Sequence, residues 1–488
     1  MNLNKEQNLE KLLAILILFA TFIFIPYRIL SVGYMPTDDA NRHIAFSTTN
    51  QTWSDVLVIK PSLSSDHNAG WHSLLRFIHR YLKISKEGLI YLSVIGLFCL
   101  FNITGTILSP NKAAWIILLT IMFLFDRSII LRTLSGRPFI ISNIITLILL
   151  KIWFLDSDKE DYSLKYLGSI ILLTIAVWLH GTWYTFLILP MALLLSGEIK
   201  QSLELSFIIL LSTILGAFLT GEFNQFLYFH YTATLNIFSE KIYNWQLVTE
   251  FAEGNINILW LVPTFFITML SIYSKKMKLN DLSKDRLFIC ILLCWLLSLK
   301  VIRFWVDWGT VALMFWLSHK LSELIEDMKS IKKPFMRNTM FILAVLSSIL
   351  FMTNSAWNNQ KKRAEYSVDF SKPEFAEYKP LDGGIIYNDD MNHFYYQYYN
   401  DPEGKYKYVL GFEPVIMTDE NRMVYREIIY SYYNYKSYKI WIDKLTEKDR
   451  IFVSIDLSKN YPELDWIRAG KHLYIGKEKK EIRNKPTE

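Results

Sequence analysis

The distribution of apolar residues along the chain is the most informative feature of the sequence. Long apolar runs separated by polar connectors fill most of the first 355 residues. A run of about twenty such residues can span a bilayer as a helix. The pattern therefore predicts a polytopic α-helical membrane protein with about eleven spans, although several runs are short. The predicted spans cover residues 12–30, 87–108, 113–126, 138–154, 165–179, 183–196, 203–220, 256–273, 286–299, 304–318 and 339–354.

The last part of the chain has the pattern of a soluble domain. We therefore predict a transmembrane domain over residues 1–355 and a soluble domain over residues 356–488. In the second domain short strand-like segments alternate with helix-like segments, which predicts a small α/β domain with a mainly parallel sheet. The strand-like segments are 384–387, 406–410 and 450–455, and the helix-like segments are 391–399 and 421–435.

A polar loop, residues 33–85, connects the first two predicted spans. It contains amphipathic pieces at residues 53–59 and 71–82, and the apolar positions of the second piece recur at helical spacing. Aromatic and basic residues on an amphipathic helix are typical of helices that lie on a membrane surface. We therefore expect the second piece to be a surface helix in contact with membrane lipids.

Composition and charge support membrane insertion and suggest an orientation. Hydrophobic residues make up 52% of the chain, more than a soluble domain requires. Basic residues concentrate in the connectors 275–286 and 319–338, and such connectors stay on the cytoplasmic side. With an odd number of spans, the N-terminus is then cytoplasmic and the C-terminal domain extracytoplasmic. The expected location is the cell (plasma or inner) membrane, and the net charge of +6 gives no indication of nucleic-acid binding.

The cysteines and glycines exclude two classes of chemistry. Cys99, Cys290 and Cys294 all lie in apolar runs, so their spacing fits neither a disulfide framework nor a zinc site. The soluble domain has no glycine-rich phosphate loop before a helix, which leaves nucleotide binding unsupported.

Two adjacent carboxylates follow the first predicted span. If Thr37 caps a short helix, Asp38 and Asp39 fall in its first turn, where the helix dipole favours anions. Asp39 and His43 then share a face because they are four residues apart. Such carboxylates would remain ionised and could act as bases. The alternative interpretation is a solvated acidic turn.

Basic residues stand at the outer ends of several predicted spans. A cation at membrane depth costs about 2.5–3.5 kcal/mol, so such residues usually face a cavity or a partner. Each residue alone could reach the lipid headgroups or anchor a helix. Together with the carboxylates they suit transfer chemistry on a lipid phosphate. The residues are Arg132, Arg137, His180, Lys300 and Arg303.

The order of these motifs resembles that of the C-type (GT-C) integral-membrane glycosyltransferases, which use polyprenyl-linked sugars. The resemblance covers nearly the whole chain. The sequence departs from the commoner forms at Asn244, where an acid is frequent, and at Thr182, where a second glycine is usual. The motifs are the acidic stretch from Asp38 to His43, the helix from Trp71-His72, Gly136-Arg137-Pro138, Trp178-Leu179-His180-Gly181, Asn244-Trp245-Gln246 and Arg303, followed by the soluble outer domain.

The resemblance implies transfer of a sugar from a polyprenyl-phosphate donor to a hydroxyl of a lipid, glycan or protein acceptor. It assigns catalysis to Asp38, Asp39 and His43. Asp39 and His43 are too few ligands to require a divalent metal such as magnesium or manganese, so a metal is left open. The implied donor phosphate-binding residues are Arg132, Arg137, His180, Lys300 and Arg303, and those of the acceptor side are Asp66, His67, His72, Trp245 and Gln246.

Two other functions are compatible with a polytopic chain. A transferase or polymerase of whole lipid-linked oligosaccharides would share the outer cations, but it predicts large arginine-rich outer loops. A membrane transporter is less favoured, because transporters generally show inverted repeats and broken helices near the midplane.

Overall fold

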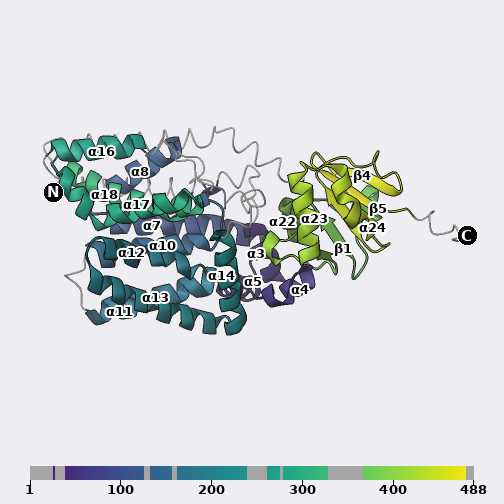
Figure 1. Cartoon of the computed structure of the whole chain (residues 1–488), viewed down its shortest axis with the longest axis horizontal. Helices are drawn as coiled ribbons and strands as arrows, with labels where there is room; N and C mark the ends of the chain where they lie inside the picture. Colours follow the sequence, from purple (N-terminus) through teal and green to yellow (C-terminus); the bar gives the residue numbers. More distant parts are fainter. Residues whose placement is uncertain are drawn as a thin grey trace, which may run out of the picture. The chain divides into compact units, whose positions relative to one another are not determined.

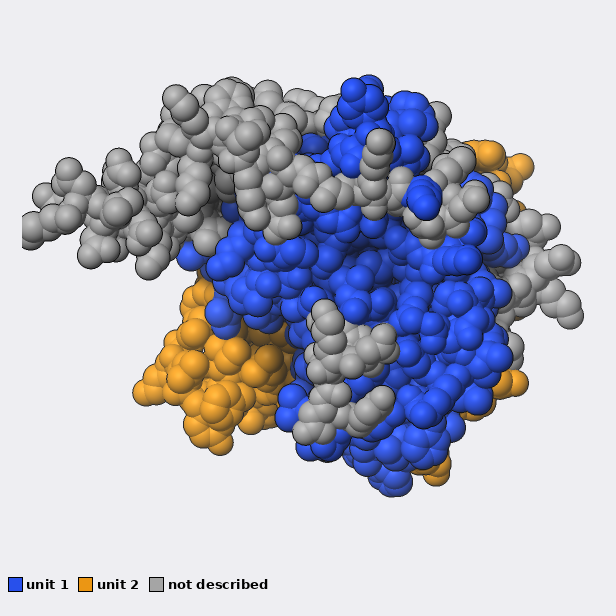
Figure 2. Space-filling view, turned by 90° about the vertical axis from the view of Figure 1, so that its left-hand side faces the viewer, with its two compact units in different colours: residues 1–34, 91–221, 250–357 blue, residues 35–90, 222–249, 358–488 orange. Residues whose placement is uncertain are grey.

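The computed structural model of the chain contains mainly helices, with a small sheet near the C-terminus (Figure 1). It describes residues 23, 26–27, 39–125, 132–155, 162–238, 261–274, 278–327 and 366–479. Two compact units are distinguished by colour in Figure 2. Unit 1 comprises residues 1–34, 91–221 and 250–357, and unit 2 comprises residues 35–90, 222–249 and 358–488. The predicted boundary between residues 355 and 356 lies outside the described residues.

Unit 1 consists of apolar helices packed against one another. The helices α11 (Tyr162–His180) and α13 (Ile199–Leu219) lie side by side (Figure 1). Gly216 permits this approach, because a Cβ atom there would lie 2.6 Å from Cγ1 of Val177. The other helices are α7 (Leu97–Leu108), α8 (Lys112–Phe125), α10 (Phe139–Leu150), α12 (Ile188–Leu195), α16 (Leu261–Tyr273), α17 (Arg286–Ser298) and α18 (Thr310–Asp327). Shorter turns are η3 (Leu92–Gly96), η4 (Lys151–Leu155), η5 (Trp183–Leu187), η8 (Leu279–Lys284) and η9 (Phe304–Gly309).

Three helical segments among the described residues are long and apolar enough to cross a membrane. They are Lys86–Leu108, Ser163–His180 and Ile199–Leu219. Their exposed faces carry large apolar side chains, such as Ile107 and Phe207. Water disfavours such a face and lipid accommodates it. The described part of the chain therefore has helices suited to a bilayer.

Fewer helices reach spanning length than the eleven runs predicted. The runs within the described residues are helical, but shorter apolar helices replace several of the expected spans. The runs 12–30 and 339–354 lie almost wholly outside the described residues. The shorter apolar helices are Phe139–Leu155, Trp183–Leu195, Val262–Tyr273 and Arg286–Ser298.

Unit 2 is built around a five-stranded sheet with the strand order β2-β1-β3-β5-β4. The strands β1, β2 and β3 pair in parallel, whereas β5 pairs antiparallel with both β3 and β4. The strands are β1 (Ile385–Asn388), β2 (Lys407–Tyr408), β3 (Arg450–Val453), β4 (Leu464–Gly470) and β5 (Leu473–Glu478). Its helices are α3 (Asp39–Thr48), α4 (Trp53–Val56), α5 (Ala69–Leu82), α6 (Lys86–Tyr91, whose last residue belongs to unit 1), α14 (Phe223–Phe238), α21 (Pro373–Ala376), α22 (Met391–Asn400), α23 (Asp419–Tyr430) and α24 (Lys439–Asp443), with short 3₁₀ turns at Pro61–Leu63, Pro414–Ile416 and Tyr435–Tyr438.

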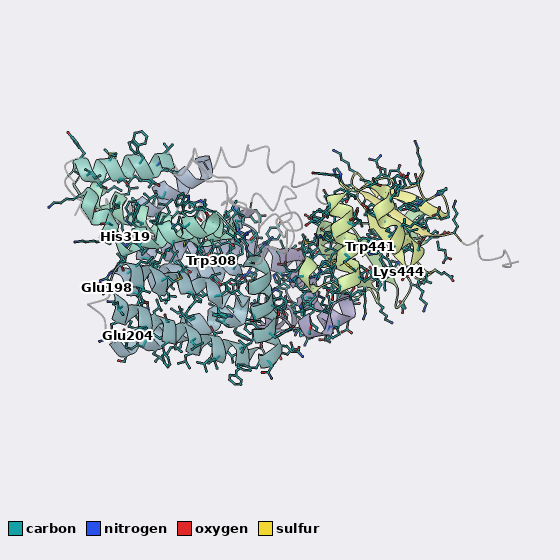
Figure 3. All side chains as sticks on the ribbon, in the orientation of Figure 1. Glu198, Glu204, Trp308, His319, Trp441 and Lys444 are labelled. Atoms are coloured by element: carbon teal, nitrogen blue, oxygen red, sulfur yellow. The ribbon has the colours of Figure 1, made fainter. Side chains whose placement is uncertain are left out.

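Two apolar clusters form the core of unit 2. One joins α23, α24 and the sheet around Trp441, which is fully buried (Figure 3). The other joins Phe46 and Trp53 of the first loop to Phe394 and Phe452 of the C-terminal segment. Residues that are far apart in sequence therefore fold as one body. The hydrophobic pattern of the sequence predicts instead that the first loop and the C-terminal segment belong to separate domains.

The expected sheet requires correction. The sheet is mixed and not mainly parallel, because the hairpin of β4 and β5 adds two antiparallel pairings. The amphipathic piece at residues 53–59 is helical only as far as Val56. Leu57 and Ile59 instead form bridges to Tyr408 and Met417 beside the sheet.

Candidate functional site

A buried carboxylate in unit 1 holds two of the predicted donor-binding arginines. Asp307 lies in η9, and its side chain is fully buried. Its Oδ2 accepts hydrogen bonds from Arg132 Nη2 at 2.7 Å and Arg303 Nε at 3.2 Å, and its Oδ1 accepts another from Arg132 Nε. π-helical turns such as η9 are rare in proteins, and those that occur are frequently found at functional sites. The three side chains together carry one net positive charge.

A third predicted residue, His180, lies close to the same arginine. The Arg132 guanidinium is 4.7 Å above the ring of Phe139, and this ring is 6.2 Å from that of His180. Nδ1 of His180 lies 2.7 Å from Thr182 Oγ1 and 3.2 Å from Ser142 Oγ. The structure therefore brings Arg132, Arg303 and His180 into one region. We call these three residues, together with Asp307, the cation cluster.

The other two predicted donor residues are placed differently. Arg137 is buried two residues before α10 begins, directly after Gly136. Gly136 has a φ of +66°, and a Cβ atom there would lie 3.1 Å from Cγ2 of Val94, so glycine allows the loop to turn against η3. Lys300 is exposed in the turn between α17 and η9.

Three predicted residues of unit 2 form a hydrogen-bonded chain. Nδ1 of His43 lies 2.7 Å from Nε2 of His72, and Nδ1 of His72 lies 2.6 Å from Oδ2 of Asp66. Both histidines are 1% exposed. His43 belongs to α3 and His72 to α5, which pack against each other. We call Asp66, His72 and His43 the relay.

The charges around the relay favour an ionised carboxylate. Burial alone would raise the pKa of Asp66, but the charge of His72 and its hydrogen bond lower this pKa to about 2. Asp66 is therefore negative at neutral pH. Arg42 lies close by, with its guanidinium 4.1 Å above the ring of Phe412 and 5.6 Å from that of Trp53.

Two further histidines lie next to the relay, of which His230 is buried and His67 is partly buried. The ring of His67 stacks on Phe229 at 4.9 Å and meets His230 edge-on at 6.4 Å. Burial, assisted by the charge of Arg42, lowers the pKa of His67 to about 3. Burial lowers the pKa of His230 to about 3 as well. Both imidazoles are therefore neutral near pH 7, and the environment does not prepare them to carry charge.

Several predicted site residues cannot be placed. Asp39 is the first residue of α3, but its side chain is outside the described atoms. Asp38, Trp245 and Gln246 are also outside the described residues. Among the residues that the structure does describe, no three His, Cys, Asp or Glu side chains are arranged to hold a metal ion.

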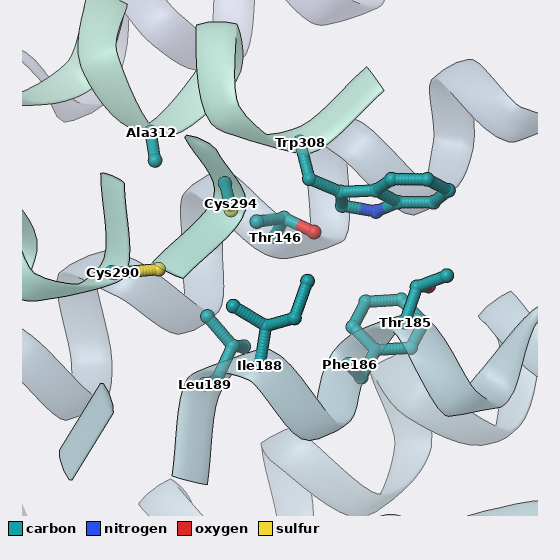
Figure 4. A pocket seen from close by; sticks show the side chains of 9 residues that line it. All are labelled: Thr146, Thr185, Phe186, Ile188, Leu189, Cys290, Cys294, Trp308 and Ala312. Carbon is teal, nitrogen blue, oxygen red and sulfur yellow. The ribbon is translucent and has the colours of Figure 1, made fainter. Parts of the chain in front are cut away.

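A small cavity lies beside the cation cluster in unit 1 (Figure 4). Trp308, the residue after Asp307, forms one wall, and Thr146 and Phe186 form others. Its volume of about 10 Å³ has room for one water molecule, so we assign no part of a substrate to it.

Asp307 is the functional candidate that the sequence reasoning missed. It lies within the apolar run 304–318 and four residues after Arg303. Both features indicate a functional residue, because an ionisable side chain in an apolar helix costs free energy and commonly has a function. Its main partner, Arg132, is 175 residues away, so the pairing itself could not be read from local spacing.

Comparisons with protein families and with characterised proteins found no match to this chain. The geometry of the cation cluster and the relay therefore carries the functional argument.

Proposed function

We propose that the protein is a membrane glycosyltransferase that moves a sugar from a polyprenyl-phosphate carrier to an acceptor hydroxyl at the outer face of the membrane. The observation that carries the proposal is the cation cluster. Arg132, Arg303 and His180 come together among apolar helices, where an anionic headgroup with an apolar tail would find both charge and lipid.

The cation cluster suits a phosphate leaving group. The leaving oxygen of a sugar phosphate is already anionic, so it needs cations and hydrogen-bond donors and no general acid. Guanidinium groups bind phosphate through two parallel N–H bonds. Asp307 fixes the orientation of both arginines and reduces their net charge to one, which matches a single phosphate better than a pyrophosphate.

The proposed acceptor side comprises the carboxylates at the start of α3 and the relay. Asp38 or Asp39 would deprotonate or orient the acceptor hydroxyl, and general-base assistance contributes about 10²–10⁴ in rate. His43 lies one helical turn after Asp39, and the relay connects it to His72 and Asp66. Trp245, Gln246 and His67 complete the proposed acceptor side.

We predict that the lysine variants Arg137→Lys and Arg303→Lys weaken use of the donor and leave the fold intact. Lysine keeps the charge but loses the bidentate fork. A lost charged hydrogen bond costs about 1.5–3 kcal/mol, so the KM for the donor should rise roughly tenfold to a hundredfold. Arg286→Lys is the matched control, because Arg286 pairs with Glu198 elsewhere in unit 1.

The assay for the proposed function offers purified protein either a polyprenyl monophosphate sugar or a pyrophosphate-linked oligosaccharide, with a chelator present. We expect turnover of the monophosphate donor. Turnover of the pyrophosphate donor alone, or a strict need for added magnesium or manganese, would support the alternative of oligosaccharide transfer. Uptake of a solute without any transfer of sugar would support the alternative that the protein is a membrane transporter.

The proposal includes about eleven spans, a cytoplasmic N-terminus and an extracytoplasmic C-terminal segment, on the charge asymmetry of the connectors. Ser283→Cys and Ser458→Cys test this orientation, since Ser283 precedes α17 and Ser458 follows β3. An impermeant thiol reagent added to intact cells should label the cysteine at position 458 and spare the one at 283. The reverse pattern would invert the topology.

A further inference from the structure

The hydrogen bonds of the relay determine which nitrogen of each histidine carries a proton. A neutral imidazole has one N–H donor and one acceptor nitrogen. Because Asp66 is ionised, it only accepts, so His72 must donate from Nδ1. In the form of the relay that can act as a base, both histidines are neutral; Nε2 of His72 is then an acceptor, and the 2.7 Å contact requires His43 to donate from Nδ1. The proton of His43 is thereby fixed on Nδ1, and Nε2 bears the lone pair.

We propose that Nε2 of His43 is the base that takes the proton of the acceptor hydroxyl, and that His72 and Asp66 are positioning residues that hold His43 in this tautomer. This inference rests on the proposed function and refines it. The carboxylates of Asp38 and Asp39 then orient the acceptor and need not take its proton.

The acceptor O–H bond breaks and its proton goes to Nε2 of His43, while the acceptor oxygen forms a bond to the anomeric carbon of the sugar. The bond from that carbon to the phosphate oxygen breaks, and its electron pair leaves with the phosphate. His43 can then pass its Nδ1 proton to His72, which places the positive charge beside Asp66.

Burial makes this arrangement effective. His43 and His72 are each 1% exposed, and the rings of Phe46 and Trp53 surround His72 at 4.7 Å and 5.8 Å. In such surroundings the negative charge of Asp66 stabilises an imidazolium more strongly than it would in water.

Apart from Asp66, the groups around the relay whose side chains the structure describes are positive or neutral. The charged and titratable neighbours are Arg42 on α3, Arg76 on α5 and His67 between the relay and α14, together with Tyr398 of α22, which interacts electrostatically with Arg76. Arg42 and Arg76 both disfavour an imidazolium, so Asp66 is the group that compensates for them.

The test compares the dependence of kcat/KM on pH for the wild type and Asp66→Asn. Asparagine keeps the shape and removes the charge. The imidazolium then loses its counter-ion, so the acid limb should move down by about one pH unit or more. The weaker base should also lower the plateau at least about tenfold. A structural role would lower the plateau without moving the limb, and that result would overturn the proposal, as would an unchanged profile.

Asp55→Asn is the matched control in the same unit. Asp55 caps α4 through Thr52 and is outside the relay, so this variant should keep the wild-type profile. A spectroscopic measurement separates the inference from the proposed function. In ¹⁵N-histidine-labelled wild type, the signals that disappear in His43→Gln should show a proton on Nδ1 and none on Nε2. The opposite tautomer would overturn the relay assignment even if sugar transfer is found, whereas the expected tautomer in a protein that transfers no sugar would defeat only the function.

Discussion

The variant Asp307→Asn is expected to lose about 3–5 kcal/mol of stability, because it removes one partner of a buried ionic group. Asp307 is fully buried and contacts both Arg132 and Arg303. Without the carboxylate, two guanidinium groups face each other in surroundings of low polarity. Purified protein should show a marked fall in its thermal unfolding midpoint, or a loss of monodisperse protein.

Two further variants separate this explanation from a general effect of substitution. Asp443→Asn breaks the exposed pair with Lys439, whose side chains are 57% and 66% exposed, and should cost less than about 1 kcal/mol. The triple change of Asp307→Leu with Arg132→Met and Arg303→Met removes the whole ionic group and should recover stability, since buried charges replaced together by apolar side chains are often neutral or stabilising. If the single variant Asp307→Asn is as stable as the wild type, this result contradicts the role given to Asp307.

The elements that could be predicted from the sequence are those with a clear local period. The strand-like segment 384–387 overlaps β1, the segment 450–455 contains β3, and the helix-like segment 391–399 lies within α22. The apolar run 87–108 was also recognised, because Lys86–Leu108 is helical and is long and apolar enough to cross a membrane. In each case one face or one run of residues is buried, and burial imposes the pattern.

The elements that were missed have weak local patterns. The strand β4 is partly exposed at the edge of the sheet, so its residues do not alternate cleanly between apolar and polar. Likewise, the first loop has polar character over residues 33–85, yet Phe46 and Trp53 are buried by the C-terminal segment. Such partners are supplied by parts of the chain that are distant in sequence.

The candidate site was predicted by residue type and not by geometry. Cations at helix ends and histidines after the first span were identified because charge among apolar residues is costly. Their connections could not be predicted, because the contact of His43 with His72 and that of Arg132 with Asp307 join different helices. A pattern identifies candidates, whereas tertiary packing decides which of them share a proton or a charge.

The second large effect expected is a loss of stability on mild acidification, which depends on His230. This histidine is 3% exposed between Phe226 and Phe229, and burial lowers its pKa from 6.5 to about 3. Above pH 6.5 His230 is neutral in both the folded and the unfolded chain, so its burial in the neutral form does not lower the free energy of unfolding through proton binding. As the pH falls below 6.5, the unfolded chain binds a proton that the folded chain refuses, and stability declines until the pH approaches 3. Between pH 7.5 and pH 5 the loss should be about 2 kcal/mol.

The thermal unfolding midpoint of the purified protein at pH 7.5 and pH 5 measures this effect. His67, with a pKa also near 3, adds in the same direction, whereas Asp66 remains ionised down to about pH 2 and adds nothing in this window. The variant His230→Phe fits the aromatic surroundings and removes the titrating group, so its midpoint should fall less on acidification. Phe229→Leu is the control, since it disturbs the same cluster and should lower the midpoint at both pH values while retaining the wild-type difference between them. If His230→Phe and the wild type lose the same stability at pH 5, the buried neutral state of His230 is not what limits stability in acid.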